Sequence, residues 1–507
     1  MLSRKTVTDL RHRNRLRNQF RLSGVGQRRL PGLRASATKI LFILISIQVG
    51  LSQAQAQILQ LPTPVGDPLA FAMDSDPLLA IERETAAAAD FKALIEQALA
   101  TSPAIREAEA RNLEAVAGRN LARAEQLPSG DLSVSSFRTL SRAFSNDPQN
   151  IIERSRARQR TDATIALTQP LIDFGASANR IAAAQQRLAG SEARYNAIAE
   201  DLGLRGVAAW YELFAMRTLV ALGEALDASQ QALGTAIDER IAEGVSARAD
   251  RVRVDGTIAE TRARLARYRR QQASAEARFT ELLGPPPIRL LRAPAPASVA
   301  IPTGEALEHT VDASPVVLAA RSDADASRRD ADAVRADLLP TVSVGVDAGR
   351  YGVIETDIDY DLRVRLNIRL RLFGGGDARV DQAGARAMAD IARAERVRAE
   401  TLREARIAAS DVVALENQLE ALRDSYVAAK ISRDVLVERF RVARGSLFDV
   451  LSAEDALFAT ATAYVEAIVD LDIARYVLLA RTGQLLPVFG LEADPRRSWP
   501  ITGGAVR

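Results

Sequence analysis

The chain has 507 residues, of which 47% are hydrophobic, 26% are charged and only 5% are aromatic. This composition is enough to bury a core, and it is more typical of long helices than of an aromatic-rich enzyme interior. The sequence has no cysteine, which excludes disulfides, thiolate metal sites and thiol nucleophiles and argues against a lipid anchor on an N-terminal cysteine. The two histidines, His12 and His309, cannot form a His-rich metal site, so neither a cofactor nor an enzymatic activity is expected.

Positive charge is concentrated at the N-terminus. Residues 1–56 carry eleven Lys and Arg against one acidic residue, whereas the remainder carries 56 Lys and Arg against 63 Asp and Glu. Because the remainder is slightly acidic with both signs interspersed, the sequence does not indicate a nucleic-acid partner.

An apolar run over residues 40–49 follows the basic stretch and precedes Ala54-Gln55-Ala56, a small-x-small pattern. This arrangement predicts a cleaved signal peptide over residues 1–56, with an unusually long basic region, and therefore export. The alternative is a membrane anchor, but the run is well short of the roughly 20 residues that span a bilayer as a helix.

The sequence contains an internal repeat. Ser102-Pro103 recurs as Ser314-Pro315 with an offset of 212 residues, and Phe174-Gly175 recurs as Phe373-Gly374 with an offset of 199. The change of offset places 13 additional residues of the first copy in one surface loop. The predicted division is into a signal peptide (1–56), an N-terminal linker (57–89), a first repeat (90–284), a Pro-rich linker (285–304), a second repeat (305–486) and a C-terminal tail (487–507).

Each copy is predicted to run helix, strand, loop, strand, very long helix, turn and helix. The serines of the two Ser-Pro pairs are expected to cap helices that end near Leu127-Pro128 and Leu339-Pro340. The strands are expected over residues 131–137, 163–169, 341–347 and 361–373. The helical pattern then continues without proline from Gly175 to about Ala242 and from Gly374 to about Ala443, which is nearly 70 residues or about 100 Å in each copy. Apolar residues at three- and four-residue steps predict coiled-coil-like packing.

The strand expected over residues 361–373 has the sharpest pattern in the sequence. Aliphatic residues alternate with polar ones, which predicts one face in contact with lipid and one in contact with water. Its length matches a tilted membrane-spanning strand, although an exposed strand of a soluble sheet would show the same alternation. The residues expected to face a water-filled lumen are Arg363, Arg365, Arg369 and Arg371.

Glycines in polar turns interrupt the two long helices. Gly244 with Val245, and Gly445 with Ser446, are predicted to form the tips of two helix hairpins far from the strands. The run of three glycines over residues 374–376 lacks the Lys-Ser/Thr of a phosphate-binding loop and is interpreted as a strand-to-helix junction.

Four strands per chain are too few to close a barrel, yet a sheet in lipid must close because every backbone polar group needs a partner. Three chains would supply twelve strands. The predicted fold class is therefore mainly α with membrane β. We expect a trimeric 12-stranded β-barrel continued by a long α-helical, coiled-coil-like barrel, with two structural repeats in each chain and a role in passage rather than chemistry.

Residues 90–486 resemble the TolC family of outer-membrane channels, particularly those that serve type I secretion. The resemblance rests on residues 168–175 (Thr-Gln-Pro-Leu-Ile-Asp-Phe-Gly), on residues 438–451 at the second tip, and on the run over residues 453–483. It implies a homotrimer in the lipid of the outer membrane that extends into the periplasm. A periplasmic adaptor (membrane fusion) protein and an inner-membrane ABC or RND transporter would engage the hairpin tips.

The resemblance also implies a gate at the periplasmic end. In similar proteins an acid at the position of Asp449 lines the closed entrance, a second acid follows one turn later, where this chain has Ser452, and a basic gate residue lies near Arg444. The alternative for Asp449 is an acid stabilised by the helix N-terminus.

The expected function is the exit duct for type I protein secretion or tripartite efflux. One alternative is the outlet of an RND-type drug efflux pump, although many such outlets are lipoproteins and this chain has no cysteine. Another is a periplasmic coiled-coil structural protein, which would leave the signal peptide and the strands without a joint explanation.

Overall fold

The computed structural model of the chain describes residues 75–142, 149, 151, 156–296, 302–355 and 359–491. The predicted signal peptide lies outside these residues. The elements in chain order are α1 (Pro77–Ala80), α2 (Ala88–Thr101), α3 (Pro103–Ala124), β1 (Ser129–Arg138), β2 (Gln159–Ile172), α5 (Ala176–Ala242), α6 (Arg248–Leu283), α7 (Glu305–Asp312), α8 (Pro315–Ala336), β3 (Thr341–Arg350), β4 (Tyr360–Arg369), α9 (Gly376–Arg441), α10 (Leu447–Arg481) and α11 (Leu485–Val488). The series α3, β1, β2, α5, α6 recurs as α8, β3, β4, α9, α10, so the internal repeat of the sequence is a structural repeat.

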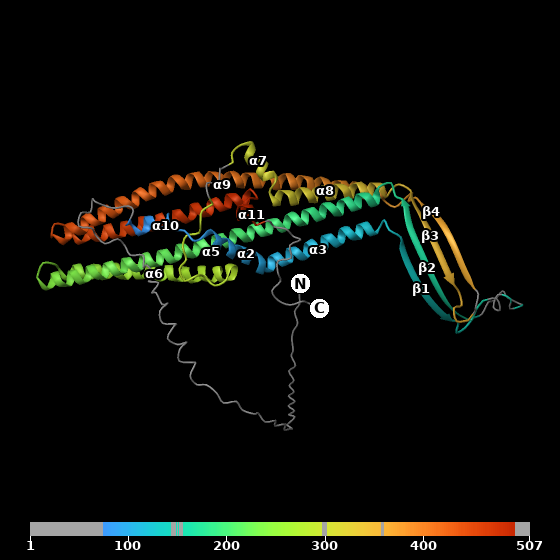
Figure 1. The fold of residues 1–507 in the computed structure, drawn as a ribbon, viewed down its shortest axis with the longest axis horizontal. Helices are drawn as coiled ribbons and strands as arrows, with labels where there is room; N and C mark the ends of the chain where they lie inside the picture. The colour runs from blue at the N-terminus through green and yellow to red at the C-terminus, as the bar shows by residue number, and fades with distance from the viewer. Residues whose placement is uncertain are drawn as a thin grey trace, which may run out of the picture. The chain divides into compact units, whose positions relative to one another are not determined.

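The long helices pack side by side (Figure 1). Next to the sheet, α3 contacts α5, α5 contacts α8, and α8 contacts α9; farther along, α6 packs on α5, and α10 packs on both α9 and α5. Helix α5 has 67 residues and α9 has 66, or about 100 Å each. Both begin and end within two residues of the predicted bounds. Among the described helices, none combines the length and apolarity needed to cross a membrane.

Caps and glycines set the ends of these helices. Ser102 caps α3 by accepting a 3.2 Å hydrogen bond from the amide of Ala104, with proline at the first helical position. Ser314 occupies the same position before α8, but its hydroxyl makes no cap bond. Gly175 (φ 92°) precedes α5 and Gly375 (φ 74°) precedes α9. These left-handed conformations favour glycine, which fits the predicted strand-to-helix junctions.

The main core lies where α2, α5, α6, α9 and α10 meet, and aromatic rings fill much of it. Phe91 packs edge-on against Trp210, with ring centres 5.1 Å apart, and against Phe489 at 5.7 Å. The described part of the Pro-rich linker is fixed to this core by side-chain hydrogen bonds: Trp210 donates to the carbonyl of Leu291 and Tyr211 to that of Ala293, both at 3.0 Å. The composition of the linker did not predict this anchoring.

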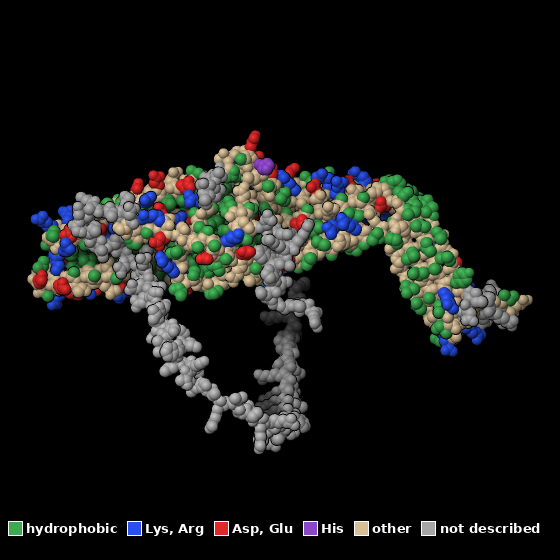
Figure 2. Space-filling view, in the orientation of Figure 1, with side chains coloured by type: hydrophobic (Ala, Val, Ile, Leu, Met, Phe, Trp, Pro, Cys, Tyr) green, Lys and Arg blue, Asp and Glu red, His purple; other side chains and the backbone are tan. Residues whose placement is uncertain are grey.

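The four strands form an antiparallel sheet in sequence order. One row across it, on one face, is Leu132, Ile165, Ala348 and Leu362. The next row lies on the opposite face and is Asp131, Ala166, Asp347 and Arg363. Hydrophobic side chains gather over the strands in Figure 2. The sheet therefore keeps one apolar and one polar face, and its outer strands β1 and β4 pair with only one neighbour each among the described residues.

The strand predicted over residues 361–373 is shorter in the structure. β4 ends at Arg369, which lies opposite Thr341, the first residue of β3. The chain enters β3 from α8 at that point, so the residues after Arg369 have no neighbouring strand with which to form ladder hydrogen bonds. The prediction that Arg371 lies on this strand is therefore wrong; Arg371 lies in the connection to α9.

Candidate functional site

The two hairpin tips share one helix-ending geometry. After α5, Gly244 adopts φ 78° and the amide of Val245 donates to the carbonyl of Arg240 at 2.8 Å. After α9, Ala443 adopts φ 56° and the amide of Arg444 donates to the carbonyl of Arg439 at 2.8 Å. This six-residue bond with a left-handed residue is the Schellman ending, in which glycine is preferred. Ala443, rather than Gly445, is thus the structural counterpart of Gly244.

Gly445 has a different role from Gly244. A Cβ atom at Gly445 would lie 3.0 Å from the backbone nitrogen of Phe440. The second tip therefore needs a residue without a side chain because the turn folds back onto the end of α9.

The tips of the two hairpins contact each other. A small core made of Ile237 (α5), Val254 and Ile258 (α6), and Leu447 and Leu451 (α10) holds them together. Arg240 closes this core at its edge, since its guanidinium lies 4.6 Å from the centre of the Phe440 ring and donates to the Phe440 carbonyl at 3.1 Å. The local sequence around Arg240 and Phe440 does not predict this contact, because neither residue is unusual in its surroundings.

Asp449 lies in the first turn of α10, where its amide donates a 3.1 Å hydrogen bond to the capping hydroxyl of Ser446. The side chains of Asp449 and Ser452 are both exposed, whereas Val450 and Leu451 between them are buried. Arg444 is exposed in the preceding turn. Neither Asp449 nor Arg444 forms a salt bridge within the part of the chain that the structure describes, so their charges remain available on this surface.

Two further acids near the second tip face elsewhere. Glu454 is buried and accepts a 2.7 Å hydrogen bond from the Ser229 hydroxyl, and its burial raises the pKa of the carboxyl. Asp455 forms a 2.6 Å salt bridge with Arg264 of α6. These two acids connect α10 to the first hairpin and do not share the exposed side of Asp449.

The arginines of β4 lie on the polar face of the sheet. Arg363 pairs with Asp361 on its own strand, and Arg365 pairs with Asp347 of β3 at 2.5 Å. Arg369 follows on the same face, because side chains alternate along a strand. The opposite face carries the aliphatic residues, and four of these are about two-thirds exposed: Leu362, Val364, Leu366 and Ile368.

The described residues contain no group of three His, Asp or Glu side chains that could hold a metal ion. His309 lies exposed in the last turn of α7. The remaining features are a two-faced sheet, very long helices and a pair of contacting tips.

A family model described as "Outer membrane efflux protein" matches residues 94–285 and 306–484. The chain belongs to the outer membrane efflux protein family. The two matched segments fall on the two structural repeats, and members of this family are transport channels of the outer membrane rather than enzymes.

Relatives of known structure share this fold. The outer membrane protein VceC of Vibrio cholerae superposes with a TM-score of 0.69 at 19% identity, covering 78% of this chain and 96% of VceC. The CmeC outer membrane channel of Campylobacter jejuni superposes with a TM-score of 0.70 at 15% identity, covering 78% and 86%. These superpositions confirm the fold class predicted from the sequence.

The chain is also similar in sequence to Protein CyaE of Bordetella pertussis, with 28% identity over 66% of this chain and 70% of the length of CyaE.

Proposed function

We propose that three copies of this chain join their sheets edge to edge into a twelve-stranded barrel in the outer membrane, with the helices continuing the duct through the periplasm. The observation that carries this proposal is the sheet itself. Its aliphatic face, with Leu362, Val364, Leu366 and Ile368, is exposed, and its edges β1 and β4 lack a second partner among the described residues. Both features are costly in water, and both are resolved when identical sheets close in lipid.

In this arrangement the polar face of the sheet lines the bore. Arg363, Arg365 and Arg369 would then face water inside the barrel, opposite the aliphatic residues that contact lipid. Arg371 would lie below the barrel, at the entrance to the helical part, because β4 has already ended.

The hairpin tips would form the periplasmic entrance. We assign adaptor contact to Gly244 and Val245 on the first tip and to Gly445 and Ser446 on the second. Val245 supports this assignment because its apolar side chain is 61% exposed at the turn. The adaptor would connect the tips to an energised inner-membrane transporter, of the ABC or RND type, and the duct itself would supply no energy.

Closure of the entrance would depend on Asp449, Ser452 and Arg444. Their exposure on one chain leaves them free to meet the equivalent groups of neighbouring copies around a threefold axis. Ser452 replaces the second acid, so one ring of carboxylates is expected here instead of two.

The exit duct for type I secretion or tripartite efflux is the role we favour. The sequence has no cysteine, whereas many outlets of RND-type pumps are lipoproteins. The second tip reads Gly-Ser-Leu-Phe-Asp and belongs to the stretch, residues 438–451, that resembles the channels of type I secretion. The outlet of an RND-type drug efflux pump is the second candidate, supported by the family description as efflux proteins. A periplasmic coiled-coil structural protein would not need an exposed aliphatic sheet face.

Adjacent residues of β4 allow a direct test of which face meets lipid. Leu366→Arg should prevent assembly into the membrane, since an arginine on the lipid face costs about 2–4 kcal/mol at mid-bilayer. Asn367→Arg is the matched control on the other face and should assemble and conduct in planar bilayers. Equal assembly and equal conductance of the two variants would refute the proposal.

A further inference from the structure

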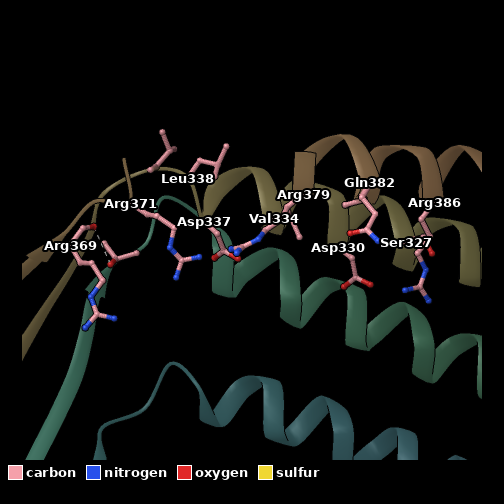
Figure 3. Close-up of a pocket in the computed structure, with 13 residues that line it drawn as sticks. Ser327, Asp330, Val334, Asp337, Leu338, Arg369, Arg371, Arg379, Gln382 and Arg386 are labelled. Atoms are coloured by element: carbon pink, nitrogen blue, oxygen red, sulfur yellow. Dashed lines mark hydrogen bonds between the residues drawn. The ribbon is translucent and has the colours of Figure 1, made fainter. Parts of the chain in front are cut away.

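A cavity of about 600 Å³ lies where β4 passes into α9, beside the end of α8 (Figure 3). Four arginines reach its wall: Arg369 from β4, Arg371 from the connection, and Arg379 and Arg386 from α9. The last two are seven residues apart and therefore lie on one side of α9. The acidic residues in the wall are Asp330 and Asp337, both on or just after α8.

The two carboxylates are already paired with another helix. Arg180 of α5 donates to both oxygens of Asp337, at 2.7 and 2.6 Å, and Arg187 of α5 pairs with Asp330. The side chains of the four cavity arginines have no hydrogen-bond or salt-bridge partner in the described chain. The acids Asp377 and Asp381 precede and follow Arg379 in sequence, but neither lines the cavity. The cavity therefore keeps a strong positive charge.

The cavity opens on the polar face of the sheet. Arg369 shares its face of β4 with Arg363 and Arg365, and Thr341, which lies opposite Arg369, also lines the cavity. The aliphatic face is on the other side of the strand. In the proposed barrel the cavity faces the solute in the duct at the level where the barrel ends, and lipid headgroups meet the opposite side.

We propose that this cavity binds oxyanions, that is, phosphate, sulfate or carboxylate groups of solutes in the duct, and that it gives the duct a preference for anions. Guanidinium groups present paired N–H donors that match two oxygens of such a group. Several unpaired guanidiniums around one space attract anions and repel cations. The location of the site in the duct and its effect on ion preference rest on the proposed function, whereas the binding of oxyanions does not.

Two measurements test the inference, both on the full-length protein. The first is the ³¹P linewidth of dissolved inorganic phosphate added to the detergent-solubilised protein. The second is the reversal potential in phosphatidylcholine bilayers under a potassium chloride gradient. The test variant replaces Arg371, Arg379 and Arg386 by Gln. The control replaces Arg253, Arg267 and Arg270 of α6 by Gln, which removes the same charge from exposed arginines far from the cavity in sequence.

The expected result is broadening of the phosphate signal by the unchanged protein and by the control, with loss of broadening in the test variant. The chloride-to-potassium permeability ratio should fall several-fold in the test variant alone. Equal broadening and equal permeability ratios in all three proteins would overturn the inference while leaving the proposed channel intact. Absence of conductance in all three would refute the channel, and the phosphate signal would still decide the site. Phosphatidylglycerol dissolved in the same detergent serves as the lipid comparison, and broadening of its phosphorus signal without any effect on dissolved phosphate would also overturn the assigned ligand.

Discussion

Arg240 near the end of α5 contacts Phe440 near the end of α9 in two ways, through a 3.1 Å hydrogen bond to its carbonyl and through its ring, whose centre is 4.6 Å from the guanidinium carbon. The carbonyl of Arg240 also accepts the hydrogen bond from the Val245 amide that closes the end of α5. The end of one hairpin is thus fixed to the end of the other within one chain. Any opening that moves the second hairpin relative to the first has to break this contact.

Replacing Arg240 should favour the open entrance. A cation–π contact contributes about 0.5–2 kcal/mol and a hydrogen bond about 1 kcal/mol. Because about 1.4 kcal/mol is a factor of ten, Arg240→Gln should raise the ratio of open to closed single channels roughly ten- to a hundredfold. Arg253→Gln, on the exposed side of α6, is the control and should leave it unchanged. An open probability that is the same in both variants would show that this contact does not restrain the gate.

A comparison of Asp449 with Asp250, its counterpart in the first repeat, distinguishes a gate residue from an acid that only stabilises the start of its helix. Asp250 accepts a 3.2 Å hydrogen bond from the amide of Ala247 and so caps α6. Asp250→Asn should lower the melting temperature without changing conductance. Asp449→Asn should increase conductance of the closed state while costing at most about 1 kcal/mol of stability. If the two variants behave alike, Asp449 is a helix-end residue and not part of a gate.

Exchanging alanine and glycine at the left-handed positions of the two tips should change the melting temperature in opposite directions. Ala443 carries a Cβ atom at φ 56°, a conformation that costs about 1 kcal/mol more for alanine than for glycine. Ala443→Gly should therefore raise the melting temperature, and Gly244→Ala should lower it. Differential scanning calorimetry of the detergent-solubilised proteins measures both. A lower melting temperature for Ala443→Gly would mean that the turn is not strained.

Most of the fold follows from local patterns in the sequence. The absence of proline and the three- and four-residue steps predict α5 and α9 to within two residues, because a helix of this length needs only continuity and an apolar side. The alternation of aliphatic and polar residues in β4 predicts its two faces, because successive side chains of a strand point to opposite sides of the sheet. The predicted end of β4 is too late because the alternation continues to Leu372, whereas the ladder ends where β3 begins.

Long-range contacts of the candidate site could not be predicted in this way. The arginines of the cavity come from β4, the connection and α9, and their lack of partners depends on Arg180 and Arg187 taking the nearby carboxylates. The contact of Arg240 with Phe440 joins residues 200 positions apart. Both depend on how the two repeats pack, which is a tertiary property.

The buried salt bridge between Arg292 and Asp472 should be a major stabilising contact between the Pro-rich linker and α10. Its two hydrogen bonds are 2.6 and 2.8 Å long, and the Asp472 side chain is fully buried. Removing one partner of such a pair leaves a buried charge and costs about 3–5 kcal/mol. Asp472→Ala should lower the melting temperature strongly. Glu84→Ala breaks the exposed bridge to Arg289 and should change it little; similar losses in the two variants would contradict the assigned role.

Glu200 on α5 should make stability depend on pH. Burial raises the pKa of its carboxyl from 4.5 to about 8. The folded chain therefore keeps this proton between pH 4.5 and 8 while the unfolded chain loses it, so the contribution to stability is complete below pH 4.5 and declines as pH rises to 8. Each pKa unit corresponds to about 1.4 kcal/mol.

The neutral variant Glu200→Gln isolates this effect. Asp201, Glu400, Glu404 and Arg481 line the same cavity as Glu200 and are unchanged in the variant. The two proteins should have similar melting temperatures at pH 4.5, and the variant should be increasingly more stable toward pH 8. If the difference in melting temperature between the two proteins stays constant from pH 4.5 to 8, Glu200 is hydrated and ionised in the folded protein.

The mass of the protein extracted from outer-membrane fractions tests the central claim most directly. Native mass spectrometry in detergent should give three chains per particle, because only pooled strands can pair both edges of the sheet and cover its aliphatic face with lipid. A water-soluble single chain, recovered without detergent from the periplasmic fraction, would contradict the account.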